Sequence, residues 1–488
     1  MIELICLQGS GYVQIPNLLE SKKRGQSEVE VIREDHIIND SLKTLGLGKK
    51  YFIKTYGCQM NIRDTQTIKA LLEGMSYKET DNYEDADLMM LNTCAIRENV
   101  HYKVFGMLGR FKHLKLTKPD IIVGLSGCMA QEENVVNNII DKYKWMDFVI
   151  GTHNIHRLPL VLNDALLKRH LEVEVWSKEG DIVEDIPVKR DSEYKAWVNI
   201  MYGCDKFCTY CIVPFTRGKQ RSRMPEDIIK EVEQLVRAGY KEVTLLGQNV
   251  NAYGKDFNDV NYKMDDLLEG VSKTGIERIR FVTSHPWDFT DGMIDVIKNN
   301  ANIMPYFHLP IQSGSDKILK LMGRRYNRDS YLTLFNKIRN NIPKASITTD
   351  IIVGFPNESE EDFNDTLDIY NKCKFDGAYT FIYSPREGTP ASKMRDDISM
   401  DEKKARLQRL NKVVNDYAHQ SNEKLLHKIV PVLIEGYSGK EGCLMTGYTD
   451  TSKLVNVKGD KKDIGHIVNV EIIDIKSWSL TGVIVDEN

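Results

Sequence analysis

The chain has 488 residues, of which 41% are hydrophobic and 28% charged, and its formal net charge is −4. This length favours several domains, and the composition excludes a disordered chain and a generally basic nucleic-acid coat. The sequence contains no run of about 18 apolar residues and no secretion signal, so we expect no membrane segment and a cytoplasmic protein.

The first two segments of the chain differ in pattern. Residues 1–48 lack sustained periodicity and include the polar stretch SKKRGQSEVEVIREDH, which predicts a loosely ordered arm. In residues 49–165, short apolar runs alternate with amphipathic segments. The runs YFIKTYGC, ADLMMLNTC and DIIVGLSGC are typical of buried strands that end in small or polar residues. The pattern predicts an amino-terminal α/β domain with a parallel sheet.

A charge-rich connection at residues 166–194 leads into a second alternating series at residues 195–420. Its first helix, PEDIIKEVEQLVRAGY, has Pro225 at the start and Gly239 at the end. Six segments are predicted to be strands: AWVNIMYG, EVTLLGQN, RIRFVTSH, YFHLPIQ, ITTDIIVGF and AYTFIYSP. Six such βα units in one run predict a partial TIM-type (β/α)6 barrel.

The carboxy-terminal part changes pattern again. After residue 390 comes a long charged helix, which we expect to pack on the barrel through one face that carries Leu407, Leu410, Val414 and Tyr417. Residues 421–488 then alternate apolar and polar residues, as in VPVLIE and IVNVEIIDI, with glycines at the turns. This alternation predicts a small closed β-barrel.

Three cysteines, Cys204, Cys208 and Cys211, directly follow the first predicted barrel strand in the pattern Cys-x-x-x-Cys-x-x-Cys. Three thiolates at this spacing can bind three irons of one 4Fe-4S cluster and leave the fourth iron open for chemistry. Further polar residues and glycines fall at the predicted carboxyl ends of strands, the edge where barrel enzymes gather their sites. These are Gly247-Gln248, His285-Pro286, Gln312-Ser313, Gly354 and Ser384-Pro385.

A structural zinc site is the alternative interpretation of these three cysteines. Such a site requires four closing Cys or His ligands. The nearest histidines in sequence are His170 and His285, and neither is close. The chain has 9 cysteines, an odd number without an export signal, which argues against a disulfide framework and for reduced thiols that can bind metal.

A second set of cysteines, Cys58, Cys94 and Cys128, ends the three strands predicted within residues 49–165. The carboxyl ends of parallel strands meet at one edge, so we expect the three thiols to converge and to hold a second cluster. The alternative is that they pack as small hydrophobic residues. That alternative is preferred for the three cysteines that lack such a setting, Cys6, Cys373 and Cys443.

Five motifs occur in order: YGCQMN at 56–61, NTCAIRENV at 92–100, GCDKFCTYCIVPFTRG at 203–218, GQNVNAYG at 247–254 and YSPREGTPA at 383–391. Together with the two cysteine sets, they resemble the MiaB family of radical S-adenosylmethionine methylthiotransferases, from about residue 50 to the end. That family combines an amino-terminal three-cysteine domain, a radical core and a carboxy-terminal TRAM barrel. The arm before residue 49 departs from the resemblance, and no function is carried over to it.

The resemblance implies insertion of a methylthio group at carbon 2 of N6-isopentenyladenosine at tRNA position 37, giving 2-methylthio-N6-isopentenyladenosine. It implies two 4Fe-4S clusters, one on each cysteine set, and S-adenosylmethionine both as methyl donor and as radical source. The residues that it suggests for the S-adenosylmethionine pocket are Tyr210, Gly247, Gln248, Gln312, Ser313 and Gly354. No residue is assigned as a general acid or base.

The implied partners are a tRNA carrying N6-isopentenyladenosine, an electron donor such as flavodoxin or ferredoxin, and a sulfur donor, with no membrane. A basic segment with interspersed aromatic residues is a candidate RNA contact. Its basic residues are Lys206, Arg217, Lys219, Arg221 and Arg223. In residues 421–488 acidic residues outnumber lysines, so RNA binding there rests on the resemblance to TRAM.

Two other functions are compatible with the sequence. A sister methylthiotransferase acting on threonylcarbamoyladenosine or on an aspartate of a ribosomal protein would use the same clusters, although NTCAIRENV and CDKFCTYCIVPFTRG favour MiaB. A non-catalytic RNA-binding protein with structural metal belongs to a different class. Anaerobic reconstitution separates that class from an enzyme, because only the enzyme cleaves S-adenosylmethionine.

Overall fold

The computed structural model describes residues 13–14, 16, 30–33, 38–96, 98–178, 180–258, 261–438 and 444–485; Cys6 and Cys443 lie outside them. The chain forms two compact units. The first contains the residues up to Asp191 together with Met201–Lys206 and Cys211–Arg223, and the second contains the remainder. Within the described part of the chain, no helix is long and apolar enough to cross a membrane.

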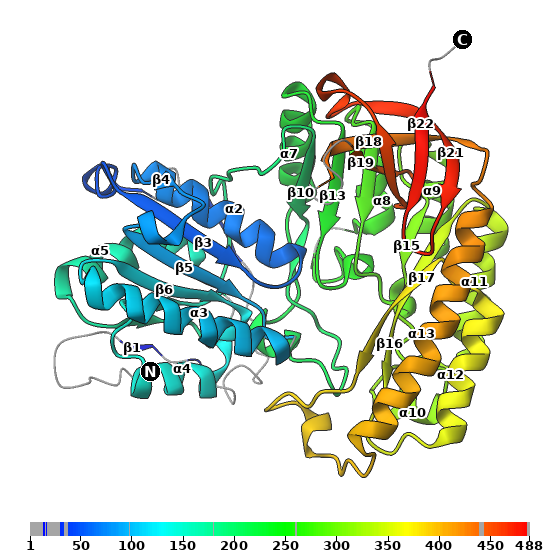
Figure 1. Ribbon diagram of the computed structural model, residues 1–488, viewed down its shortest axis with the longest axis horizontal. Coiled ribbons are helices and arrows are strands. Elements are labelled where there is room, and N and C mark those ends of the chain that lie inside the picture. Colours follow the sequence, from blue (N-terminus) through cyan, green and yellow to red (C-terminus); the bar gives the residue numbers. More distant parts are fainter. Residues whose placement is uncertain are drawn as a thin grey trace. The chain divides into compact units, whose positions relative to one another are not determined.

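The first unit is built on a seven-stranded sheet in which every neighbouring pair of strands is parallel. In spatial order its strands are β1 (Val13–Gln14), β8 (Glu172–Glu174), β7 (Phe148–Ile150), β6 (Ile122–Gly127), β5 (Leu88–Thr93), β3 (Lys50–Thr55) and β4 (Lys78–Glu79). Strands β5 and β6 are buried along their whole length, as expected for parallel strands covered on both faces. The predicted parallel α/β domain is therefore present (Figure 1).

Helices cover both faces of this sheet: α2 (Gln59–Gly74), α3 (Glu98–Thr117), α4 (Glu133–Lys142) and α5 (Leu158–Lys168). Apolar residues of α2 and α5 share one core cluster with the sheet, whereas residues of α3 and α4 share another. Figure 1 shows the two helix pairs on opposite sides of the strands. Because helices pack on both faces of the sheet, the strand ends that precede the amino-terminal cysteines are held in place.

The arm, which was predicted to be loosely ordered, and the charge-rich connection both contribute strands. In the arm, β1 pairs with β8, and β2 (Val31–Arg33) pairs in parallel with β9 (Ile182–Glu184). Both partners lie in the charge-rich connection, residues 166–194, which also contains the end of α5. Strand pairing across such a distance in the chain is not visible in local sequence patterns.

The second unit contains all six strands predicted for the barrel. They form two parallel three-stranded sheets: β10 (Lys195–Asn199), β13 (Glu242–Leu246) and β14 (Arg278–Phe281), then β15 (Tyr306–His308), β16 (Ser346–Val353) and β17 (Gly377–Ile382). A parallel bridge joins Ile279 of β14 to Ile303, just before β15. The partial (β/α)6 architecture is confirmed.

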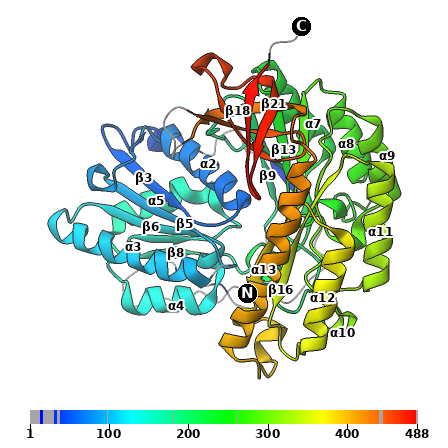
Figure 2. The same cartoon turned by 45° about the vertical axis from the view of Figure 1, so that its right-hand side comes forward.

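The helices of this unit are α7 (Pro225–Arg237), α8 (Met264–Ser272), α9 (Asp291–Asn299), α10 (Asp316–Leu321), α11 (Arg328–Asn341), α12 (Glu360–Cys373) and α13 (Met400–Glu423). Helix α7 begins at Pro225 as predicted and buries Ile228, Val232 and Leu235. Helices α11, α12 and α13 lie next to one another (Figure 2), and α13 packs against β17. Leu410 and Val414 of α13 are buried, as the apolar stripe predicted.

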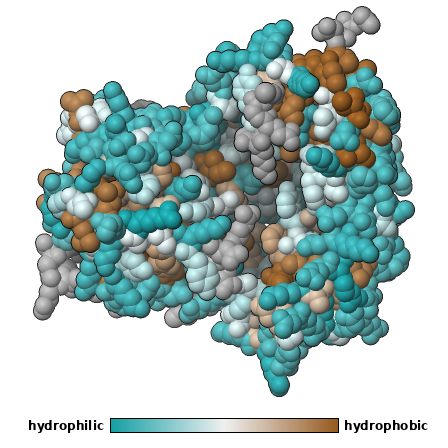
Figure 3. All heavy atoms as spheres, viewed as in Figure 1, coloured by the Kyte–Doolittle hydropathy of each residue, from teal (hydrophilic) through white to brown (hydrophobic). Residues whose placement is uncertain are grey.

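The chain ends in a closed barrel with strand order β18-β19-β20-β22-β21. The strands are β18 (Ile429–Tyr437), β19 (Met445–Thr449), β20 (Leu454–Lys458), β21 (Ile467–Ile475) and β22 (Leu480–Ile484). Its interior is apolar, and apolar side chains also gather on its surface (Figure 3). The predicted small β-barrel is confirmed.

Two buried arginines of β14 attach this barrel to the parallel strands. The guanidinium of Arg278 donates to the carbonyl oxygens of Tyr448 and Pro431, both at 3.0 Å. Arg280 donates to the carbonyl oxygens of Asp450 at 2.9 Å and Thr449 at 2.7 Å. The terminal barrel is therefore a docked part of the second unit rather than a freely tethered domain.

Candidate metal centres and cofactor site

The amino-terminal cysteines lie at one edge of the seven-stranded sheet. Cys94 directly follows β5, Cys128 directly follows β6, and Cys58 is the N-cap of α2, three residues after β3. Because β3, β5 and β6 are adjacent and parallel, their carboxyl ends meet. The structure thus brings together three thiols that are far apart in sequence.

Asn61 lies between these thiols. Its Oδ1 accepts from Cys58 Sγ at 3.6 Å and from Cys128 Sγ at 3.8 Å. Its Nδ2 donates to the carbonyl oxygen of Thr93 at 2.7 Å, which fixes the amide beside the end of β5. Gly57 has a φ of +137°, and a Cβ there would lie 2.8 Å from the Cβ of Cys94. Only glycine allows this close approach of the two cysteine-bearing loops.

A buried guanidinium completes the surroundings of the three thiols. Arg217 pairs with Asp64 at 2.6 Å, and its Nε donates to Cys128 Sγ at 3.1 Å. A terminal nitrogen of Arg217 also donates to Asn61 Oδ1 at 3.3 Å. Burial raises the pKa of the Cys128 thiol to about 12, although the positive charge of Arg217 acts in the opposite direction. A thiolate here therefore needs nearby positive charge, which a cluster iron supplies on binding.

The RNA-contact interpretation of the basic segment is wrong for its three arginines, because all three are buried. Arg217 pairs with Asp64, and Arg223 makes two 2.7 Å contacts with the carboxylate of Glu184. Arg221 lies over the ring of Tyr202 at 5.7 Å from its centroid. These side chains hold the first unit together instead of facing nucleic acid.

The Cys-x-x-x-Cys-x-x-Cys motif lies in a loop between β11 (Met201–Tyr202) and α6 (Val213–Thr216), followed by β12 (Arg221–Ser222). The N–H of Cys204 donates to the carbonyl oxygen of Gly218 at 3.1 Å, and Cys204 Sγ accepts from the N–H of Lys206 at 3.4 Å. Gly203 has a φ of +70°, and a Cβ there would clash with the carbonyls that follow α6. The backbone is therefore folded tightly around Cys204.

The residue after Cys211 also touches the other cysteine set. Ile212 packs with Ala95 and Cys128 in one small buried cluster, with Phe215 beside them. The hydroxyl of Thr152 donates to the carbonyl oxygen of Thr216 at 2.8 Å. One short helix, α6, thus fixes the segment that carries Cys211 against the sheet edge that carries Cys128.

Cys208 has its own buried arginine in the second unit. Arg324 donates to Cys208 Sγ at 3.4 Å and to the carbonyl oxygen of Pro310 at 2.9 Å. The N–H of Thr209 donates to the carbonyl oxygen of Met322 at 2.9 Å. In both cysteine sets, therefore, a sulfur accepts from a buried guanidinium.

The ligand role of the six cysteines is still a prediction. Among the described residues, no three Cys, His, Asp or Glu side chains are arranged to hold a single metal ion. In a 4Fe-4S cluster each thiolate binds a different iron. Three thiols grouped around one amide, with a neighbouring guanidinium, are a donor set of the right kind for such a cluster. Cys373, by contrast, is buried in α12, where burial raises the pKa of its thiol to about 12.

Three of the predicted S-adenosylmethionine residues lie at the carboxyl ends of strands of the second unit. Gly247 and Gln248 directly follow β13, and Gly354 directly follows β16. The ring of Tyr210 packs edge-on against Phe355, with centroids 6.5 Å apart. Their contact with the cofactor stays a prediction.

Several buried polar atoms near these residues have no hydrogen-bond partner in the described structure. They are Gln248 Oε1, Asn249 Oδ1, Asn251 Oδ1 and Ser284 Oγ. All four lie beyond the carboxyl ends of β13 and β14. Buried polar atoms of native proteins are normally paired, so this group fits a polar ligand such as S-adenosylmethionine.

Gln312 and Ser313 shape the backbone near this edge. Gln312 has a φ of +72°, and its peptide groups bond to Asp350 and Ile352, both at 2.9 Å. The hydroxyl of Ser313 lies 3.4 Å from that of Thr366. These two residues therefore continue the pairing of β16 and hold the loop that leads to α10.

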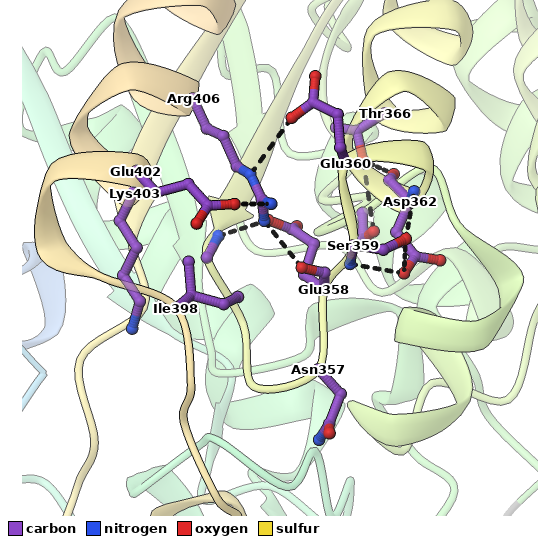
Figure 4. A network of polar contacts seen from close by, with 12 residues as sticks. Asn357, Glu358, Ser359, Glu360, Asp362, Thr366, Ile398, Glu402, Lys403 and Arg406 are labelled. Carbon is purple, nitrogen blue, oxygen red and sulfur yellow. Dashed lines mark hydrogen bonds and ion pairs between the residues drawn. The ribbon is translucent and has the colours of Figure 1, made fainter.

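A buried ion pair holds the loop that begins at Gly354 (Figure 4). The N–H of Gly354 donates to Glu358 Oε2 at 2.7 Å, and Arg406 of α13 donates to the same oxygen at 2.8 Å. Arg406 also pairs with Glu402 and donates to the carbonyl oxygen of Glu358 at 2.9 Å. Burial raises the pKa of the Glu358 carboxyl, while Gly354 and Arg406 act in the opposite direction. Helix α13 thus fixes the backbone at Gly354.

Sequence reasoning missed the buried side chains beside the cysteines and at the Gly354 loop. Asn61 stood within the quoted motif YGCQMN, and Arg217 within a segment interpreted as RNA-binding. Arg324 and Arg406 gave no signal, because an isolated arginine is usually solvated. Their burial is the observation that distinguishes them.

Family models match three parts of the chain. The Radical SAM superfamily matches residues 198–369, the TRAM domain matches residues 424–485, and Uncharacterized protein family UPF0004 matches residues 50–151. Among solved structures, the radical S-adenosylmethionine methyltransferase TsrM from Kitasatospora setae has a TM-score of 0.51 at 12% identity and covers 70% of this chain and 75% of that chain. At this identity the likeness supports the fold alone.

Curated relatives match nearly the whole chain. A tRNA-2-methylthio-N(6)-dimethylallyladenosine synthase from Staphylococcus epidermidis is 54% identical over 475 residues, which are 97% of this chain and 92% of that protein. One of the same name from Geobacillus thermodenitrificans is 55% identical over 472 residues, 97% of this chain and 90% of that protein. The chain carries a radical S-adenosylmethionine core and a TRAM domain, and it belongs to the tRNA-2-methylthio-N(6)-dimethylallyladenosine synthase family.

Proposed function

We propose that this protein inserts a methylthio group at carbon 2 of N6-isopentenyladenosine at position 37 of tRNA, using two 4Fe-4S clusters and S-adenosylmethionine. The observation that carries the proposal is the meeting of Cys58, Cys94 and Cys128 at one sheet edge, in a chain that also carries the Cys204 motif. The 54% identity to a synthase of that name, over 97% of this chain, supports the substrate.

The two cysteine sets have separate tasks in this proposal. Bound at the Cys204, Cys208 and Cys211 cluster, S-adenosylmethionine supplies a 5'-deoxyadenosyl radical, an agent suited to an aryl C–H bond without useful acidity. Cys58, Cys94 and Cys128 would hold the second cluster, which would carry the sulfur to be transferred. The unpaired side-chain oxygens after β13 and β14 would orient the cofactor, and Arg406 fixes the Gly354 loop through Glu358.

The RNA contact that we propose is an exposed aromatic face. Tyr379 and Phe381 lie two residues apart in β17 and therefore on one face, and they are 59% and 41% exposed. Trp478 of the terminal barrel lies over Gly377 on that same face, 3.4 Å from where a Cβ would be, and is 56% exposed. Unpaired bases stack on such rings. This face links the parallel strands to the TRAM barrel, both of which would then touch the substrate.

The proposal also includes partners that supply electrons and sulfur: a donor such as flavodoxin or ferredoxin, and a sulfur donor. The proposed location is the cytoplasm, which a need for reduced clusters and a tRNA substrate supports.

Nucleoside mass spectrometry tests the proposed reaction. A bacterial strain that lacks its own synthase accumulates N6-isopentenyladenosine, and expression of this chain should convert that nucleoside into the 2-methylthio form. Methylthiolation of threonylcarbamoyladenosine, with isopentenyladenosine unchanged, would instead identify the sister activity. RNA binding without either product and without S-adenosylmethionine cleavage would leave only the non-catalytic alternative.

A further inference from the structure

Arg217, in the candidate RNA segment, donates from its side chain to a cysteine sulfur. Its side chain is 6% exposed, and its Nε donates to Cys128 Sγ at 3.1 Å. It lies on the segment that follows α6, six positions after Cys211. A buried guanidinium is costly unless it is paired, and Asp64 at 2.6 Å provides that pairing.

The guanidinium of Arg217 brings a positive charge close to a sulfur ligand of the proposed second cluster. Arginine stays protonated in proteins, so the N–H that reaches Cys128 Sγ is a charge-assisted donor. Hydrogen bonds to cluster sulfurs and nearby net charge set the reduction potential of an iron-sulfur cluster. In a buried site both effects are screened little by water.

We propose that Arg217 is a positioning residue that raises the reduction potential of the cluster held by Cys58, Cys94 and Cys128, by donating to Cys128 Sγ from a buried guanidinium. The inference rests on the proposed function, because it requires the second cluster. Reduction adds one negative charge to the cluster, and the guanidinium stabilises that charge. Asp64 holds Arg217 in place and offsets part of its effect.

The other cysteine set offers a matched comparison. Arg324 donates to Cys208 Sγ at 3.4 Å, so it is expected to act on the first cluster only. Arg223 offers a control on the same segment as Arg217: it is equally buried but pairs with the carboxylate of Glu184 at 2.7 Å. Substitution of Arg223 perturbs the segment without removing the donor to Cys128.

The test measures the potential of the second cluster alone. In the full-length chain, Cys204→Ala, Cys208→Ala and Cys211→Ala remove the first cluster, and anaerobic reconstitution should leave about four irons per chain. The midpoint potential is then measured by redox titration with electron paramagnetic resonance. The same titration is repeated with Arg217→Gln, Arg217→Lys, Asp64→Asn or Arg223→Lys added.

Arg217→Gln should lower the equilibrium constant for one-electron reduction about tenfold, which corresponds to about 59 mV. Arg217→Lys keeps the positive charge and should lower this equilibrium constant less. Asp64→Asn should move the potential upward, because it removes a negative charge while its amide oxygen can still accept from Arg217. Arg223→Lys should leave the potential within a twofold change in that constant.

An unchanged potential in Arg217→Gln with iron content retained overturns the inference. If both Arg217 variants fail to bind iron, Asp64→Asn decides: an upward shift supports the inference, and no shift or a downward shift contradicts it. Absence of any iron in the parent triple variant, with the wild-type chain holding about four irons, would instead show that the proposed second cluster is wrong.

Discussion

At the scale of single residues, Asn61 connects two of the three amino-terminal thiols, those of Cys58 and Cys128. Its amide accepts from both of them and is fixed by the carbonyl oxygen of Thr93. No periodicity marks such a residue, because its role depends on three strand ends that meet only in the fold. The cysteines themselves could be identified from sequence because each ends an apolar run.

Replacing Cys58, Cys94 and Cys128 together with Ala should abolish methylthiolated tRNA but leave 5'-deoxyadenosine formation with dithionite. Radical generation requires only the open iron at the other cysteine set. Chromatography of both products from one reaction measures this, with circular dichroism to check folding. Near wild-type methylthio product would contradict a second cluster; simple packing cysteines would instead cost roughly 1 kcal/mol each in stability.

The complementary change is Cys204→Ala, Cys208→Ala and Cys211→Ala. It should halve the iron content, to about four irons per chain, and abolish S-adenosylmethionine cleavage, because the open iron is lost. Iron analysis and 5'-deoxyadenosine measurement check both parts. About eight irons in this variant would show that the ligands have been assigned to the wrong cysteines.

At the scale of elements, the loop after β16 depends on helix α13 more than 40 residues later. The side chains of Arg406 and Glu358 are 3% and 1% exposed. Arg406→Met should destabilise the protein by about 3 kcal/mol, because it leaves a carboxylate buried without its partner. Burial already raises the pKa of the Glu358 carboxyl, so the native state binds a proton there more readily than the unfolded state. The stability lost in Arg406→Met should therefore be smaller at pH 5 than at pH 8, because protonation removes the unpaired charge.

The matched control for this pair is the double variant Arg406→Met with Glu358→Gln. A neutral amide needs no guanidinium, so the double variant should be more stable than Arg406→Met alone. Thermal unfolding followed by circular dichroism compares the three proteins. A double variant less stable than the single one would argue against the buried charge as the cause.

The exposed aromatic face of β17 is expected to contribute to RNA binding. Tyr379→Ala should weaken binding of an anticodon stem-loop about tenfold, or about 1.4 kcal/mol, because one stacking platform is lost. Tyr102→Ala on α3 is the control, since that ring is also exposed and lies in the other unit. Fluorescence anisotropy measures both affinities. Equal loss in the two variants would mean that the aromatic face of β17 has no special role.

At the scale of the whole molecule, the terminal barrel has both a structural and a proposed RNA-binding role. Removal of the chain from Asn422 takes away four carbonyl acceptors of Arg278 and Arg280. The truncated protein should therefore unfold at lower temperature, since each unsatisfied buried group costs about 1–3 kcal/mol. It should bind tRNA more weakly and still form 5'-deoxyadenosine with dithionite below its unfolding temperature. Unchanged tRNA affinity of the folded truncation would contradict the RNA-binding role of the barrel.

The sequence by itself determined the local features of this protein. The six barrel strands, the helix that begins at Pro225 and the terminal β-barrel follow from periodicity and turn residues, which depend on near neighbours. The Cys204 motif is likewise readable because its ligands are seven positions apart at most.

Only the tertiary structure decided which distant groups meet. Cys58, Cys94 and Cys128 approach one another because their strands are adjacent in the sheet. Arg217 faces Cys128 and not solvent because the segment around α6 packs against Ala95 and Cys128. The pairing of β1 with β8 and of β2 with β9 also depends on contacts between distant parts of the chain. Burial of a charge is set by partners far away in the chain, so a basic segment that looked like an RNA contact holds the fold and its thiols together instead.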